Sequence, residues 1–162
     1  MQSTTPINTP NNTQNFLPFG DGWVLQDIRM KASTAAVVGT AIGVEVASNT
    51  TTGYATLMPA TNANGANFIG ILAEKISTTD TDYATAGKSK QVWVPINKNI
   101  STAYFTVGAG TFTAIDENKV VSFHSDSKSL AVDTQGAGAI IKKYINSTTG
   151  ICVFDVPNTV TA

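Results

Sequence analysis

Short segments in which apolar and polar residues alternate recur along most of the chain. In the clearest one, Val92, Val94 and Ile96 fall on one face, whereas Gln91 and Trp93 fall on the other. A period of two is typical of a half-buried β-strand, and these segments are rich in β-branched and aromatic residues. The pattern predicts strands over residues 23–30, 36–47, 54–58, 68–76, 91–96, 103–107, 120–123, 129–133, 139–145 and 151–156.

Turn-forming residues separate these segments, at 49–54, 62–67, 108–111, 115–119 and 146–150. The best helix candidate is residues 77–87, where Thr79 or Asp80 would cap a turn that ends at Gly87. No segment shows three turns of helical periodicity with caps. We therefore predict an all-β fold, a single-domain β-sandwich or β-barrel with at most one short helix.

Two glycines, Gly39 and Gly43, interrupt the apolar segment 36–47. Glycine inside a strand weakens it, because it has no side chain to pack and a large backbone entropy to lose. Such glycines usually mark a bulge or a sharp bend at the corner of a barrel. We expect one of these features here.

The first 22 residues differ from the rest. Pro6, Pro10 and Pro18 prevent regular ladder bonding, and the Asn and Thr content is too polar to form a core. The far end of this segment carries four large apolar side chains suited to docking in a groove. They are Phe16, Leu17, Phe19 and Trp23. We predict an extended N-terminal arm over residues 1–22, a β-domain over 23–157 and a tail over 158–162, the arm docking either on its own domain or on a neighbouring subunit.

The composition favours assembly over binding of polyanions. Charged residues make up 13% of the chain, which is about half of the usual share, and the formal net charge is −1. Such a chain has no general field to attract nucleic acid or an anionic membrane, and it has one arginine, Arg29. A weakly charged surface is easily desolvated against a neighbour. No secretion signal or membrane-spanning apolar segment is visible.

The residues between the segments at 68–76 and 91–96 hold the densest charge in the sequence. Asp80 and Asp82 fit the first and third positions of a calcium loop, but the later ligand positions lack oxygen-bearing side chains of the required kind. Glu74 with Asp80 or Asp82 could form the carboxylate pair of a hydrolase. An exposed charge commonly ends a strand, so we interpret this stretch as a solvated loop.

The remaining candidates for chemistry are His124 and Cys152. His124 is the one histidine and lies beside Ser122, Ser125 and Asp126, but sequence neighbours on a strand point to opposite faces and do not form a triad. One histidine and one cysteine cannot complete a zinc site. Cys152 is expected to be a small buried residue. We predict no enzyme activity, no metal site and no cofactor.

The chain resembles the decoration, or auxiliary capsid, proteins of tailed-bacteriophage heads. The resemblance rests on "GTAIGVEV" at 39–46, on residues 51–76 with "FIGILAEKI", on "DYATAGKSKQVWVPINK" at 82–98 and on residues 103–157. It covers residues 35–157. One departure is that Asn118 replaces the glycine common in the turn of this passage, and asparagine also tolerates positive φ.

This resemblance implies a β-rich structural protein on the exterior of the virion capsid. Such a protein cements the major capsid protein lattice and often assembles as a homotrimer. It implies no nucleic-acid or membrane partner. The arm and one face of the body would then supply the contacts.

Two other functions remain as alternatives. One is a carbohydrate- or cell-binding adhesion module, for which Tyr54, Tyr83, Trp93 and Tyr104 are the candidate platforms. The other is a small hydrolase, which requires Glu74 to converge with Asp80 or Asp82 in a pocket.

Overall fold

The computed structural model describes residues 15–44, 53–58, 68–136 and 138–154. It confirms the all-β prediction and contains a closed five-stranded barrel. Residues 1–14 of the predicted arm, the tail, and the predicted turn and strand residues at 45–52, 59–67 and 155–156 lie outside the described residues. No helix in the described ranges is long and apolar enough to cross a membrane.

Eleven strands form the described part of the chain, and ten of them lie at the predicted places. The exception is the short first strand. The strands are β1 Leu17–Pro18, β2 Trp23–Met30, β3 Ala41–Val44, β4 Ala55–Leu57, β5 Phe68–Leu72, β6 Lys88–Pro95, β7 Ala103–Ala109, β8 Val120–Phe123, β9 Leu130–Gln135, β10 Ala139–Asn146 and β11 Thr149–Val153. A 3-10 turn, η2 Ala114–Asp116, lies between β7 and β8.

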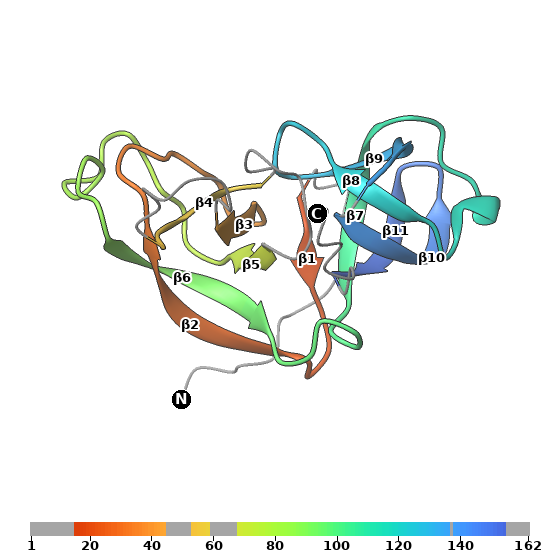
Figure 1. The fold of residues 1–162 in the computed structure, drawn as a ribbon, viewed down its shortest axis with the longest axis horizontal. Helices are drawn as coiled ribbons and strands as arrows, with labels where there is room; N and C mark the ends of the chain where they lie inside the picture. The colour runs from red at the N-terminus through yellow and green to blue at the C-terminus, as the bar shows by residue number, and fades with distance from the viewer. Residues whose placement is uncertain (1–14, 45–52, 59–67, 137, 155–162) are drawn as a thin grey trace, which may run out of the picture.

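The first barrel is formed by β2 to β6, on the left of Figure 1. Around the ring the order is β2-β4-β3-β5-β6. Four of the five junctions are antiparallel, and the ring closes through a parallel bridge between Met30 of β2 and Ala55 of β4. Gly43 lies at an irregularity of the β3–β5 pairing, as expected for a bulge in this segment.

The second barrel is formed by β7 to β11, on the right of Figure 1. Here β7 pairs with β11, β11 with β10, β10 with β8 and β8 with β9, all antiparallel. The ring closes because β9 also pairs with β7, in parallel, through Val107 and Leu130. β1 pairs with Ala103 and Tyr104, on the part of this β7 edge that β9 does not reach, and lies between the two barrels (Figure 1).

The two barrels have the same connectivity and the same strand register. In each, the first strand is parallel to the third and antiparallel to the fifth, and the second strand pairs with the third and fourth. Leu72 pairs with Val92 in the first barrel as Ile141 pairs with Cys152 in the second. Following the pairings round both rings gives one consistent set of equivalent residues. It matches Met30 with Val107, Ile42 with Val121, Val44 with Phe123, Ala55 with Leu130, Leu72 with Ile141 and Val92 with Cys152.

The barrels differ mainly in one loop. In the second barrel, β10 and β11 are joined by Ser147 and Thr148, whereas the equivalent strands β5 and β6 are joined by residues 73–87. The predicted helix at 77–87 is wrong. This loop is a series of turns because the Asp80 carboxylate accepts the N–H of Ser77, and because the Ser33 N–H donates to Tyr83 and fixes the loop against the first barrel.

Two apolar clusters fill the molecule. One lies inside the first barrel and includes Met30, Ile42, Leu72 and Val92. The other fills the second barrel and continues through the junction to residues of β2 and β5, including Trp23 and Phe68. Because this second cluster draws on both barrels, the barrels share a core and are not separated by a linker.

Candidate functional site

The N-terminal residues Asn15 to Phe19 join the two barrels. The Asn15 side-chain amide donates to the carbonyl of Val38 at 2.7 Å, and the Phe16 N–H donates to the carbonyl of Gly39 at 3.0 Å, both in the first barrel. Leu17 and Pro18 then pair with β7 of the second barrel. Five consecutive residues therefore connect a turn of one barrel to a strand of the other.

An aromatic cluster fixes this junction from inside. The Phe16 ring meets the rings of Phe123 and Phe154 edge to face, with centroids 5.8 and 5.6 Å away. Phe68 stacks on Phe154 at 4.0 Å, and Trp23 meets the same ring at 6.2 Å. The Trp23 indole N–H donates to the Thr102 carbonyl, so its polar atom is satisfied although the side chain is buried.

The four residues predicted to dock the arm are thus in contact with this chain's own body. Phe16 and Trp23 are 2% and 1% exposed, so neither is free to contact another protein. Leu17 is half-buried in β1, and Phe19 stacks on Tyr104 with centroids 4.6 Å apart. Of the two docking modes left open by the sequence, the described end of the arm adopts the intramolecular one.

The charged loop gathers three carboxylates around one ammonium group. The Lys90 Nζ lies 3.3 Å from Asp82, 3.7 Å from Glu74 and 4.0 Å from Asp80. Glu74 also accepts the backbone N–H of Gln91. The carboxylates that the hydrolase alternative requires do converge, but they converge on a lysine. Within the described residues there is no group of three or more His, Cys, Asp or Glu side chains placed to hold a metal ion.

Lys90 lies on β6, on the same strand face as Val92. Its side chain is 9% exposed, and the carboxylates around it are 32–44% exposed. Burial by itself lowers the pKa of Lys90. The hydrogen bond to Asp82 and the charges of the three carboxylates outweigh it and raise the pKa above its usual value. The cluster therefore keeps a buried lysine charged, a role that the sequence pattern did not indicate.

His124 lies in a loop that packs onto the first barrel. The Ala41 N–H donates to the carbonyl of Ser127 at 2.8 Å across the junction. Asp126 lies 3.4 Å from the His124 Nδ1, but it accepts the Ser129 hydroxyl and the Lys128 N–H. The serine is thus bonded to the carboxylate and not to the imidazole, which is not the arrangement of a nucleophilic triad. Burial of Cys152 raises the pKa of its thiol, as expected for an inert core cysteine.

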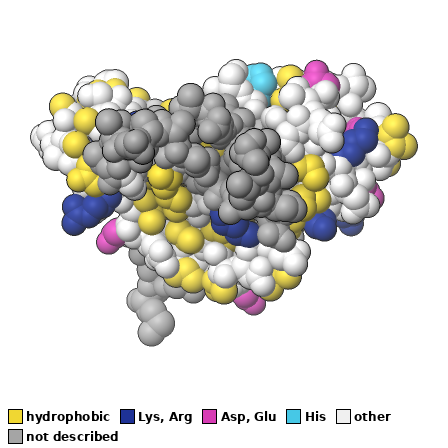
Figure 2. Space-filling model, in the orientation of Figure 1, with side chains coloured by type: hydrophobic (Ala, Val, Ile, Leu, Met, Phe, Trp, Pro, Cys, Tyr) yellow, Lys and Arg dark blue, Asp and Glu magenta, His cyan; other side chains and the backbone are white. Residues whose placement is uncertain are grey.

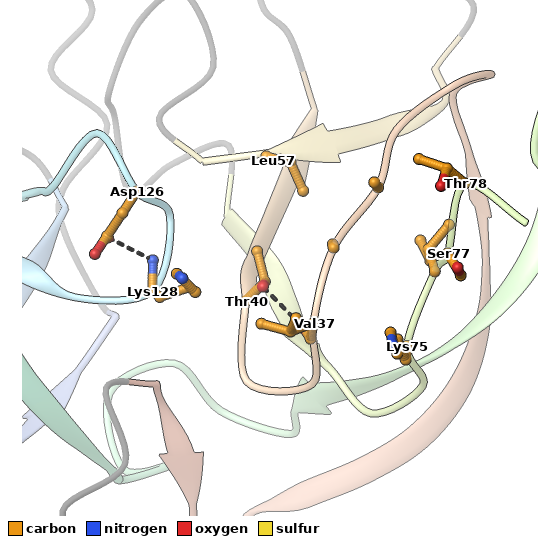
Figure 3. Close-up of a pocket in the computed structure, with 11 residues that line it drawn as sticks. Val37, Thr40, Leu57, Lys75, Ser77, Thr78, Asp126 and Lys128 are labelled. Carbon is orange, nitrogen blue, oxygen red and sulfur yellow. Dashed lines mark hydrogen bonds between the residues drawn. The ribbon is translucent and has the colours of Figure 1, made fainter.

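A groove of about 390 Å³ lies where this loop faces the first barrel. Figure 3 shows Val37 and Thr40 in its middle, with Lys128 and Asp126 on one side and Lys75, Ser77 and Thr78 on the other. The Thr40 hydroxyl donates to the carbonyl of Val37, and the Ser77 hydroxyl bonds that of Thr79. Most hydroxyl groups of the groove are therefore already paired within the chain.

The rings proposed as carbohydrate platforms pack against the body of the chain. The Tyr83 ring has the Lys88 ammonium over its face at 4.9 Å, and its hydroxyl donates to Ser33. Tyr104 is covered on one face by Phe19. Trp93 is half-buried and packs against the shared core. Tyr54 lies near Gly87, at the loop end of the first barrel.

Several aliphatic side chains are exposed on the body. Ile96 and Ile100, in the connection between the barrels, are 64% and 69% exposed, and Ile115 on η2 is 81% exposed. Val37, Val38 and Ile145 are exposed to a lesser extent. Figure 2 also shows hydrophobic side chains gathered over the region that β5 and β6 occupy. The alternating pattern placed Ile96 on the same face as Val92, but Ile96 follows the end of β6 and is exposed. Ile100 and Ile115 lie in turns, where apolar residues give no periodic signal.

Comparisons of the chain with protein-family models, with curated proteins and with solved structures found no match.

Proposed function

We propose that this chain is a non-catalytic structural protein that decorates the outer surface of a tailed-bacteriophage capsid and binds the major capsid protein. The observation that carries the adhesive role is the exposure of isoleucines on turns that hydrogen bonds hold in place. Large apolar side chains fixed in an exposed position favour protein contacts, because little entropy is lost when they bind.

Ile115 is the clearest case. Its neighbour Asp116 is buried and accepts hydrogen bonds from the N–H of Thr113 at 2.8 Å and from the Lys119 ammonium at 2.6 Å. The Asn118 N–H donates to Ile141 on β10. The turn is therefore closed by its own hydrogen bonds and attached to β10 through Asn118, and it presents Ile115 to solvent.

The connection between the barrels presents Ile100 in the same manner. The N–H groups of Ile100 and Ser101 both donate to the carbonyl of Asn97, and the Ser101 hydroxyl donates to Gly22. Burying about 100 Å² of such apolar surface would contribute about 2–3 kcal/mol before the ordering terms are subtracted. Many copies on one shell would add to its resistance to internal pressure.

The identity of the partner and the location on the virion exterior rest on the sequence resemblance. The sequence led us to expect capsid contacts from the apolar residues of the arm, but Phe16 and Trp23 belong to the core of this chain. The contacts with the capsid are assigned to the exposed isoleucines of the body. The low share of charged residues also favours a surface that is easily desolvated.

The test is to mix the purified protein with shells assembled from the major capsid protein encoded in the same genome. Sedimentation of the shells should bring the chain down at a fixed copy number per capsid protein. Ile100→Ser and Ile115→Ser should each weaken this binding, because each removes an exposed apolar contact. Asn99→Ser and Ala114→Ser are the matched controls, since they change the neighbouring exposed residues of the same turns.

Absence of the chain from the sedimented shells would overturn the proposal, as would a genome that encodes no capsid protein. Binding that is equally strong in both isoleucine variants would show that the adhesive surface lies elsewhere. The isoleucine variants should unfold at the same denaturant concentration as the wild type, which separates loss of binding from loss of the fold.

A further inference from the structure

The edge of β7 that receives β1 has an equivalent in the first barrel. On β7, Leu17 pairs with Tyr104, and the Phe19 N–H donates to the carbonyl of Thr102 at 3.1 Å. The other edge of β7 is occupied by β11. The backbone groups of Thr102 and Tyr104 that point away from β11 are therefore used by the N-terminal segment of the chain.

The equivalent strand is β2, and the register of the two barrels matches Thr102 with Leu25 and Tyr104 with Asp27. The carbonyl of Gly22 accepts the N–H of Ile96. The backbone N–H and C=O groups of the even-numbered residues of β2 therefore point toward β6. The backbone groups of Leu25 and Asp27 then face the opposite edge. β4 reaches that edge only at Met30.

This edge is open in the described part of the chain. β4 pairs with this edge next to Met30, where the Lys31 N–H donates to the carbonyl of Ala55. No described residue forms a hydrogen bond with the outward backbone groups of Leu25 or Asp27. The first barrel thus presents the same type of strand edge that β1 fills in the second barrel.

We propose that the outer edge of β2 receives an extended strand from residues 1–14 of a second copy of this chain. Strand addition to a sheet edge is a general mode of recognition in which backbone hydrogen bonds supply the affinity. The chain itself contains an example of this mode, since β1 binds to the equivalent edge in the second barrel.

The properties of residues 1–14 fit this edge. They carry no charged side chain, so they can approach the exposed Asp27 and Arg29 without like-charge repulsion. These two charges would in turn disfavour indiscriminate pairing with other strands. Pro6 and Pro10 do not exclude an edge strand, and Pro18 is already part of one in β1.

The length of the segment also allows it to reach a neighbour. Fourteen extended residues span at most about 46–50 Å, which exceeds the width of a small barrel. The segment ends at Asn15, whose side-chain amide donates to the carbonyl of Val38. An exchange in which each copy donates its segment to the next would close into a ring or continue as a chain, depending on the rotation between copies.

The experiment uses a ¹⁵N-labelled chain that begins at Asn15, mixed with the unlabelled full chain. The shortened chain keeps every described strand and all core residues, so its fold is expected to persist. On addition of the full chain, hydrogen exchange of the Leu25 and Asp27 amides should slow by about tenfold or more. The amides of Val24 and Gln26 face β6, and they should be protected throughout.

Exchange that stays fast at Leu25 and Asp27 in the mixture would overturn the proposal. So would slow exchange in the labelled full chain that does not change on dilution, because it would mean that each copy binds its own segment. Asp27→Pro, which removes the outward N–H, should abolish the mixed complex in light scattering, whereas Asp27→Asn should retain it. Neither readout involves capsids, so the result is independent of the proposed decoration role.

Discussion

Gly39 and Asn118 occupy the same position in two copies of one turn. The Gly39 N–H donates to the carbonyl of Leu72 at 2.9 Å, and the Asn118 N–H donates to the carbonyl of Ile141 at 2.7 Å. Both residues have positive φ, 89° and 71°. Leu72 and Ile141 are themselves equivalent in the two barrels, so the repeat of the strands extends to the turn that precedes β3 and β8.

Alanine should be less well tolerated at Gly39 than at Asn118. Positive φ costs an ordinary L-residue about 1–2 kcal/mol, so Asn118→Ala should destabilise the protein by about 1 kcal/mol. At Gly39 a Cβ would also lie 2.4 Å from the Cβ of Asn15 and 2.9 Å from the carbonyl of Phe16. The resulting displacement of the N-terminal segment should bring the loss for Gly39→Ala to about 3 kcal/mol. Chemical denaturation measures both.

Asn118→Gly is the control for the backbone conformation. It keeps the positive φ available and should change the free energy of unfolding by less than about 0.5 kcal/mol. Equal losses for the alanine variants at both positions would contradict the close approach of Asn15 to Gly39.

The repeat itself could not be read from the sequence. Several equivalent positions share burial but not identity, as in the pair Val92 and Cys152. The long loop 73–87 of the first barrel has no counterpart in the second, which hides the common spacing of the strands. Alternation was sufficient to find ten strands because it depends only on which face is buried. Strand pairing depends on distant partners, and a single sequence does not show it.

β1 and Lys90 were missed for different reasons. A two-residue strand that contains Pro18 gives no periodic signal. Lys90 is part of a periodic pattern, since Lys88, Lys90 and Val92 alternate on the buried face of β6. A lysine was read as a surface residue because it is seldom buried without a partner. Its partners Asp80 and Asp82 precede it in the sequence, but only the fold of the loop brings them to its ammonium group.

Phe16→Ala should destabilise the protein by about 3–5 kcal/mol, because a fully buried aromatic side chain leaves a cavity at the junction of the barrels. Leu17→Ala, at a half-buried position next to it, should cost about 1 kcal/mol. Deleting residues 1–14 should have little effect on unfolding, whereas deleting residues 1–22 should reduce stability at least as much as Phe16→Ala. Wild-type stability after the longer deletion would mean that the segment does not contribute to the core.

Lys90→Met should destabilise the protein by about 1–2 kcal/mol at neutral pH, because it removes the charge that three partly exposed carboxylates surround. The folded pKa of Lys90 is raised, so its contribution is complete below the unfolded pKa of about 10.4 and is lost as the pH rises through the folded value. The difference between wild type and variant should therefore shrink in strongly alkaline solution. Lys142→Met, on an exposed part of β10, is the control.

Asp116→Asn should show the opposite pH dependence. The hydrogen bond from Lys119, followed by that from the Thr113 N–H, holds the pKa of Asp116 below its usual value although burial opposes this shift. Its contribution is therefore present above the unfolded pKa of about 3.9 and is lost as the pH falls through the folded value.

At pH 7 the Asp116→Asn variant should be less stable than the wild type by about 1.5–3 kcal/mol, since hydrogen bonds to a buried charge are replaced by weaker ones. Denaturation at pH 7, 5 and 3 should show that this difference in the free energy of unfolding becomes smaller only in the most acidic solution. Asp133→Asn, at an exposed position of β9, should leave stability nearly unchanged at every pH. A gap for Asp116→Asn that is the same at pH 3 and pH 7 would mean that the carboxylate charge does not hold the turn that presents Ile115.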